Sequence, residues 1–195
     1  MWPDVSPNPT QEIPLARVPY HDVDSAPEAS RDALKRQSER VGKTINIFGA
    51  MAHSPAVMNL YDTAENLLGN VSNLDAATRE AIHLTIANVN ECDYCQAAYT
   101  GAAKKHGFSE EQTVQIRKGA VDGDDKLTAL LAVAREIGGN KGHVDDATWQ
   151  AALDAGWSDV ELLDAYADVV RTVMTNWFNH LVGTELDLPA APPLD

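Results

Sequence analysis

The sequence predicts an all-α fold with extended ends. Six prolines stand between residues 3 and 27, and the last residues read LPAAPPLD. Proline at this density forbids a regular helix and favours an extended arm. Between the ends, apolar residues recur at helical spacing and no alternating strand of convincing length is present. We therefore expect an extended N-terminal arm over 1–30, a helical domain over 31–187 and a tail over 188–195.

Two central helices can be placed from their end signals. Ser72 or Asp75 can cap a helix over 76–89, because short polar side chains accept hydrogen bonds from the first free amides of a helix. A second helix is expected over 92–106. Gly107 follows it and fits the left-handed position that commonly ends a helix.

Capping boxes predict where two later helices begin. Ser109 with Gln112 has the spacing of one box, and Ser158 with Glu161 has the spacing of another. The second box opens a long helix that should end near Leu181. Loops rich in glycine and aspartate separate these segments.

The composition limits the classes of function. The chain has 195 residues, 44% of them hydrophobic, and a formal net charge of −14. Nucleic-acid binding is disfavoured because it depends on clustered Lys and Arg side chains. No run approaches the ~18 apolar residues that span a bilayer, and two cysteines are too few for a disulfide scaffold. We expect a soluble, cytoplasmic protein that binds neither nucleic acid nor membranes.

The only two cysteines of the chain, Cys92 and Cys95, form a C-x-x-C unit in ECDYCQAAY. At the start of a helix, free amides and the helix dipole favour a thiolate, and one turn of helix brings both sulfur atoms to the same side. A structural zinc site needs two further ligands, and a thioredoxin-type site needs strands. The pair is therefore interpreted as redox-active, with a structural bridge as the weaker alternative. No metal or bound cofactor is expected.

Glu80 and His83 lie three residues apart on the preceding predicted helix and so share one face. Taken alone, Glu80 is typical of a solvated charge and His83 of a hydrogen-bonded histidine between helices. Their distance along the chain from the cysteines changes this interpretation. Eleven residues separate Glu80 from Cys92, and three separate Cys95 from Tyr99.

This spacing, within REAIHLTIANVNECDYCQAAYTGAAKKHGFS, resembles the active-site helix pair of the alkylhydroperoxidase D-like branch of the carboxymuconolactone decarboxylase family. A looser similarity covers about residues 45–185, through AHSP and NWFNH. The resemblance implies an all-helical fold that oligomerises. It also implies that Cys95 attacks a peroxide, that Cys92 resolves the product as a disulfide, and that Glu80 relays protons. The helix dipole alone would favour Cys92 as the more reactive thiol; we follow the resemblance and expect Cys95.

The sequence departs from the family pattern at two tyrosines. Tyr99 stands where a relay histidine is expected, and Tyr94 stands where the type member has a second histidine. Tyrosine, with a usual pKa near ~10, is a poor base at neutral pH but can donate a hydrogen bond. We therefore predict a hydrogen-bonded chain from Glu80 through Tyr99 to Cys95. His83 is an auxiliary proton carrier, and burial should raise the Glu80 pKa toward neutrality.

These features predict a thiol-dependent oxidoreductase that reduces peroxide through a Cys92/Cys95 couple. An external thiol or dihydrolipoyl group would supply electrons. Two alternatives remain open: a decarboxylase or lactone-acting enzyme of the same fold, whose members typically lack the cysteine pair, and a non-catalytic redox-sensing helical oligomer. We expect a homo-oligomer, because the proline-rich arm over 1–30 would gain burial by lying across a neighbouring copy.

Overall fold

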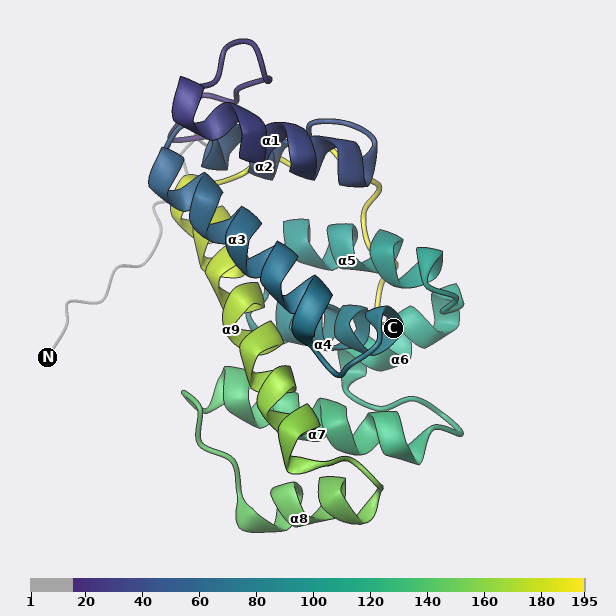
Figure 1. The fold of residues 1–195 in the computed structure, drawn as a ribbon. Helices are drawn as coiled ribbons and strands as arrows, with labels where there is room; N and C mark the ends of the chain where they lie inside the picture. The colour runs from purple at the N-terminus through teal and green to yellow at the C-terminus, as the bar shows by residue number, and fades with distance from the viewer. Residues whose placement is uncertain (1–15, 195) are drawn as a thin grey trace, which may run out of the picture.

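Nine helices, and no strands, make up the residues that the computed structural model describes, 16–194 (Figure 1). The helices are α1 (Glu28–Val41), α2 (Asn46–Met51), α3 (Pro55–Val71), α4 (Ala76–Val89), α5 (Asp93–Lys105), α6 (Glu110–Lys118), α7 (Asp125–Gly139), α8 (Asp146–Asp154) and α9 (Asp159–Val182). The predicted all-α class is confirmed.

Helix α4 lies at the centre of the molecule and packs against α5, α6, α7 and α9 (Figure 1). Ile82, Leu84 and Ile86 are fully buried, as expected for a helix surrounded by others. The same helix also buries the polar side chains of Arg79 and His83. Buried polar groups need hydrogen-bond partners, so this helix must carry a polar network inside the fold.

The predicted ends of the central helices are confirmed. Asp75, rather than Ser72, caps α4, because its Oδ1 accepts the Thr78 amide at 2.8 Å. Gly107 has a φ of +101°, and the Phe108 amide bonds back into the last turn of α5. This geometry satisfies carbonyl groups that the end of a helix would otherwise leave free.

Both predicted capping boxes form. Ser109 and Gln112 exchange side-chain and backbone hydrogen bonds at the start of α6, and Ser158 with Glu161 does the same for α9. The long helix ends at Val182, one residue beyond the predicted end. These helix starts depend on contacts within four residues, which explains why the sequence alone could place them.

Two apolar clusters share the interior. One joins α4, α6, α7, α8 and α9, and the other joins α1, α2 and α3 with the start of α5. Cys92 and Cys95 belong to the second cluster, and Tyr99 packs against both. The cysteine pair is therefore positioned where the two halves of the core meet.

Extended segments at both ends cover the top of the bundle (Figure 1). The Arg17 amide donates to the Val182 carbonyl at 2.8 Å, and the Asn46 side chain donates to the Glu185 carbonyl at 2.9 Å. Helix α1 begins at Glu28, within the stretch expected to be extended, and residues 1–15 of that predicted arm lie outside the described residues. The proposed domain boundaries stay a prediction.

Among residues 16–194, no helix is both long enough and apolar enough to cross a bilayer.

Candidate active site

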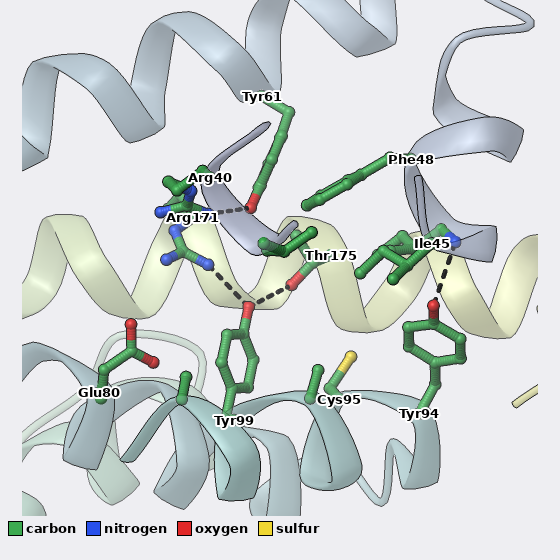
Figure 2. Close-up of a pocket in the computed structure, with 14 residues that line it drawn as sticks. Arg40, Ile45, Phe48, Tyr61, Glu80, Tyr94, Cys95, Tyr99, Arg171 and Thr175 are labelled. Atoms are coloured by element: carbon green, nitrogen blue, oxygen red, sulfur yellow. Dashed lines mark hydrogen bonds between the residues drawn. The ribbon is translucent and has the colours of Figure 1, made fainter. Parts of the chain in front are cut away.

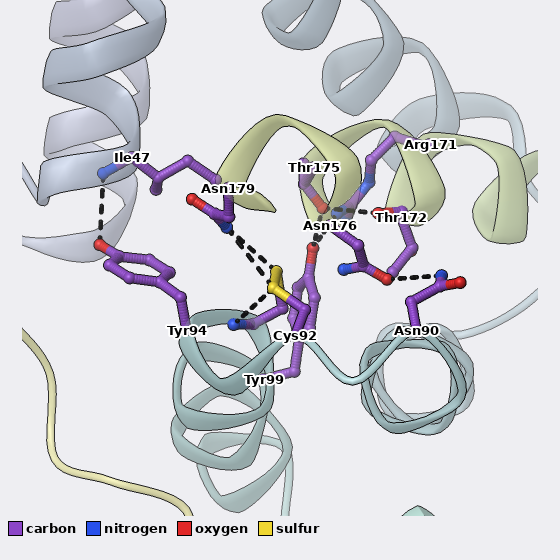
Figure 3. The surroundings of a disulfide bond; sticks show 11 residues. Ile47, Asn90, Cys92, Tyr94, Tyr99, Arg171, Thr172, Thr175, Asn176 and Asn179 are labelled. Atoms are coloured by element: carbon purple, nitrogen blue, oxygen red, sulfur yellow. Dashed lines mark hydrogen bonds between the residues drawn. A yellow bond between two sulfur atoms is a disulfide. The ribbon is translucent and has the colours of Figure 1, made fainter. Parts of the chain in front are cut away.

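The cysteine pair occupies the first turn of α5. Cys92 is the N-cap residue and Cys95 lies one turn on, with 5.3 Å between their Cα atoms and their sulfur atoms within bonding distance as a disulfide (Figure 3). The Cys95 amide donates to the Cys92 sulfur at 3.3 Å. The start of the helix therefore holds both sulfur atoms on one side and provides Cys92 with a backbone donor.

Cys95 faces a small pocket of about 90 Å³ that is lined by residues of α1 to α5 and of α9 (Figure 2). Of the residues predicted from sequence, Glu80, Tyr94 and Tyr99 also line this pocket, whereas Cys92 and His83 do not. Most of the wall is apolar. Cys95 is thus the sulfur that a small molecule in the pocket would meet first.

Beneath Glu80, His83 joins a buried ionic network. Its Nδ1 lies 3.4 Å from Glu80 Oε2 and its Nε2 lies 2.8 Å from Asp168 Oδ1. Arg79 donates two hydrogen bonds to the Asp168 carboxylate, from Nε at 3.0 Å and from Nη2 at 2.9 Å. The two carboxylates hold the imidazole ring in a fixed orientation, so His83 orients Glu80 from outside the pocket.

Arg171 organises the other side of the site. Its Nη1 donates to the Tyr99 hydroxyl oxygen at 2.7 Å, and its Nη2 lies 2.8 Å from Glu65 Oε2 (Figure 2). The Thr175 hydroxyl donates to the Thr172 carbonyl at 2.8 Å, so across the 3.2 Å contact with Tyr99 it accepts. The phenol proton of Tyr99 is therefore directed at Thr175.

The expected direct hydrogen bond between Glu80 and Tyr99 is not formed. Tyr99 contacts Arg171 and Thr175 instead, while Glu80 contacts His83. The side chain of Arg171 is almost fully buried. The hydrogen-bonded chain predicted from the sequence did not include this positive charge. A partner from a distant helix thus replaces the local contact that the spacing had indicated.

The Glu80 pKa is lowered, whereas the sequence led us to expect a rise. Burial by itself raises it, but the hydrogen bond with His83 and the positive charges of His83 and Arg171 lower it by more. The same balance of burial against the Arg171 and Arg40 charges lowers the pKa of Glu65 to about 2. Both carboxylates are therefore ionised at neutral pH.

The sequence model of the carboxymuconolactone decarboxylase family matches residues 55–136, from the start of α3 into α7. Over these residues the chain is similar to the carboxymuconolactone decarboxylase family. The matched segment contains Glu80, His83, Cys92, Cys95 and Tyr99. The predicted family is confirmed.

Solved structures share the fold over most of their length. An alkylhydroperoxidase AhpD core, an uncharacterised peroxidase-related protein from Ralstonia eutropha JMP134, is 20% identical with a TM-score of 0.79, over 89% of this chain and 93% of that one. An uncharacterised peroxidase-related protein from Silicibacter sp. TM1040 is 19% identical with a TM-score of 0.71, over 87% and 92%. The chain therefore has the alkylhydroperoxidase D-like fold, as predicted.

The debrominase Bmp8 also has this architecture. Its apo structure is 13% identical with a TM-score of 0.76, over 88% of this chain and 92% of that one, and a further structure of it holds 2,3,4-tribromopyrrole. No curated protein matches the chain. Similarity at this level of identity shows the fold alone.

Tyr94, the second departure from the family pattern, is tied to the C-terminal tail. Its hydroxyl donates to Asp187 Oδ1 at 2.7 Å and accepts the Ile47 amide at 3.3 Å. Burial, followed by the hydrogen bond to Asp187, raises the Tyr94 pKa. Tyr94 thus keeps its proton and closes the end of the pocket opposite Glu80 (Figure 2).

Sequence reasoning missed the polar contribution of α9. Six buried polar residues of this helix recur at spacings of three and four and so share one face: Asp168, Arg171, Thr172, Thr175, Asn176 and Asn179. Polar side chains in the positions that should face the core are a detectable signal, because buried polar groups are costly without partners. The periodicity of α9 could therefore have indicated that this helix turns a polar face toward the core, from which Arg171 and Thr175 reach the pocket.

Within residues 16–194, no group of three or more His, Cys, Asp or Glu side chains is arranged to hold a metal ion.

Proposed function

We propose that the protein is a thiol-dependent oxidoreductase that reduces a hydroperoxide through Cys92 and Cys95. The observation that carries this proposal is the position of Cys95: it faces the pocket, lies one turn from its partner, and shares the pocket wall with the ionised Glu80. Thiolate access and thiolate character together decide cysteine reactivity. The pocket provides access, and the start of α5 favours negative charge.

The proposed reaction takes two steps. Glu80 accepts the Cys95 thiol proton, the thiolate attacks the terminal peroxide oxygen, and the O–O bond breaks. The departing alkoxide takes that proton and leaves as an alcohol, while Cys95 becomes a sulfenic acid. The Cys92 thiol then attacks the Cys95 sulfur, releasing water and forming the disulfide. The two thiols lose the two electrons that the peroxide gains.

The remaining site residues have supporting roles in this proposal. His83 fixes the orientation of Glu80, and Tyr99 fixes Arg171, whose positive charge keeps Glu80 ionised. Because the phenol proton is directed at Thr175, Tyr99 positions charge and does not move a proton to Cys95. In place of the hydrogen-bonded chain expected from the sequence, the proposal therefore has two separate pairs: Glu80 held by His83, and Tyr99 bonded to Arg171.

Reduction of the disulfide needs an external donor, because the sequence contains no third cysteine. A dihydrolipoyl group, or two molecules of a monothiol in turn, would attack one sulfur, resolve the mixed disulfide and leave as a disulfide, restoring both cysteines as thiols. The pocket gives such a small dithiol a route to Cys95.

We also propose that the protein forms a homo-oligomer through the exposed faces of α3 and α9. Large apolar side chains are exposed along both helices: Leu60, Leu67, Val71, Val160, Leu163, Tyr166, Val170, Trp177 and Leu181. Apolar surfaces that are contiguous over two helices are uncommon on monomers and mark interfaces. A second copy of this chain, with the same apolar face, is the proposed partner.

A second candidate function, suggested by the similarity to the debrominase Bmp8, is the reductive removal of a halogen from a small aromatic ring. The observation that favours it here is the aromatic part of the pocket wall, formed by Phe48, Tyr61, Tyr94 and Tyr99. The dithiol would supply two electrons, converting C–Br to C–H with release of bromide and a proton. Decarboxylation or lactone opening has no comparable support, because neither uses a dithiol.

The proposed function is tested with the reduced protein and cumene hydroperoxide. We expect mass spectrometry to show a disulfide between Cys92 and Cys95, and repeated turnover when dihydrolipoamide is added. Cys95→Ser should abolish peroxide consumption, whereas Cys92→Ser should stop at one oxidation on Cys95. A single oxidation of the wild type without turnover would favour the redox sensor. Bromide release from a bromopyrrole without peroxide turnover would favour dehalogenation.

A further inference from the structure

The side-chain amide of Asn179 points at the cysteine pair from α9. Its Nδ2 lies 3.1 Å from the Cys95 sulfur and 3.7 Å from the Cys92 sulfur (Figure 3). Asn179 is 5% exposed, so water does not compete for the amide. A disulfide sulfur carries no hydrogen, and therefore only the NH₂ end of the amide can form these contacts.

No other hydrogen bond from the described residues orients this amide. Its Oδ1 is buried without a hydrogen-bond partner among them, and its Nδ2 donates only to the two sulfur atoms. A buried, half-satisfied amide is destabilising compared with an apolar side chain of similar size. The contribution of Asn179 must therefore be sought at the sulfur atoms and not in the stability of the helix packing.

We infer that Asn179 is a catalytic hydrogen-bond donor that stabilises the thiolate of Cys95, an inference that rests on the proposed thiol chemistry. A hydrogen bond to the charged form of a group favours that form. Each sulfur then has its own N–H donor: the backbone amide of residue 95 serves Cys92, and the Asn179 side chain serves Cys95. The start of the helix by itself favours a thiolate at Cys92, and the hydrogen bond from Asn179 shifts this preference toward Cys95.

The same helix provides a matched control. Asn176 lies one turn before Asn179, is fully buried, and accepts a hydrogen bond of 2.8 Å from Asn90 through its Oδ1. It makes no hydrogen bond to either sulfur. Removing its amide therefore perturbs the packing of α9 to a similar extent while leaving the sulfur environment intact.

The test is the pH dependence of Cys95 alkylation by iodoacetamide in full-length protein carrying Cys92→Ser, which leaves one thiol to titrate. We expect Asn179→Ala to raise the apparent Cys95 pKa by about one unit, a tenfold loss of thiolate at pH values below it. Asn176→Ala should leave the pKa unchanged. Asn179→Leu, which keeps the size of the side chain but removes the donor, should raise it by a similar amount and provides a second measurement if the alanine variant fails to fold.

An unchanged Cys95 pKa in both folded Asn179 variants, or an equal rise in Asn176→Ala, would overturn the inference. Because alkylation involves no peroxide, its outcome is independent of the proposed function. A raised pKa together with a wild type that consumes no peroxide would retain Asn179 as a thiolate donor and reject the peroxidase proposal. In a wild type that is active, Asn179→Ala should lower the rate of peroxide consumption by about the same factor as the thiolate fraction.

Discussion

Arg171 and Tyr99 are joined by a hydrogen bond of 2.7 Å, from the guanidinium Nη1 to the phenol oxygen. Because Tyr99 replaces a histidine of the family pattern, this bond shows what the substitution does to the site. The phenol oxygen accepts from a permanent cation and has no role as a base. The site thereby exchanges a second titratable group near the cysteines for a fixed positive charge.

Replacing Tyr99 by Phe should therefore affect stability more than chemistry. The change leaves a buried guanidinium with one partner fewer, and we expect the free energy of unfolding to fall by about 1–3 kcal/mol. The peroxide rate should stay within a few-fold of wild type. Urea unfolding and a peroxide assay measure the two effects. A loss of peroxide activity without a loss of stability would contradict this prediction and indicate that Tyr99 transfers a proton.

Glu80→Gln should have the opposite signature. The amide keeps the shape of the side chain but cannot accept the thiol proton, so we expect the peroxide rate to fall by about 10²-fold or more, the usual contribution of a positioned base. The pH–rate profile should lose its low-pH limb, because the group with the lowered pKa is gone. Glu111→Gln, at an exposed position of α6, is the matched control. A profile identical to wild type would remove Glu80 from the mechanism.

Glu65 should make the fold sensitive to acid. Its pKa is about 2 in the folded protein, against a usual value of 4.5, because the charges of Arg171 and Arg40 outweigh the cost of burial. A carboxyl whose pKa is lowered by folding stabilises the protein above its unfolded pKa, and this contribution is lost as pH falls through the folded pKa. About 3 kcal/mol should therefore disappear between pH 4.5 and 2.

Urea unfolding at a series of pH values measures this effect. We expect the stability of the wild type to fall more steeply below pH 4.5 than that of Glu65→Gln, which starts lower at pH 7 because Arg171 loses its ionic partner. Glu39→Gln, at an exposed position on α1, should follow the wild-type slope. Parallel slopes in all three proteins would show that the ion pair forms equally in the unfolded chain.

Charged substitutions on the apolar face should separate the subunits. Trp177 and Leu163 are 64% and 62% exposed on α9, and we expect the double variant Leu163→Lys and Trp177→Lys to be a monomer by light scattering at micromolar concentration. Burying two lysines in an interface is too costly for it to form. Asp154→Lys, on α8, changes charge away from this face and should leave the oligomer intact. A wild type that is itself a monomer would refute the proposed interface.

Local signals explain what the sequence could predict. Asp75 and Ser109 cap helices through residues three positions ahead, and Glu80 and Cys95 lie on consecutive helices joined by a short turn, so spacing alone places them. Arg171 reaches the same site from a helix whose approach is set by packing over the whole chain. Against burial, which raises it, the Glu80 pKa is lowered mainly by the hydrogen bond and the charge of His83, with the Arg171 guanidinium adding to them. The sequence-based prediction was wrong because it considered burial without these partners.

The short distance between the cysteines along the chain has a consequence for how the protein can be used. Cys92 and Cys95 are three positions apart within one helical turn, so their disulfide closes a very small loop and restricts the unfolded chain less than a disulfide between distant residues would. In the proposed redox cycle, forming or reducing this bond therefore shifts the folding equilibrium less than a long-range disulfide would. The oxidised and reduced proteins should accordingly share one fold and differ only modestly in their free energy of unfolding.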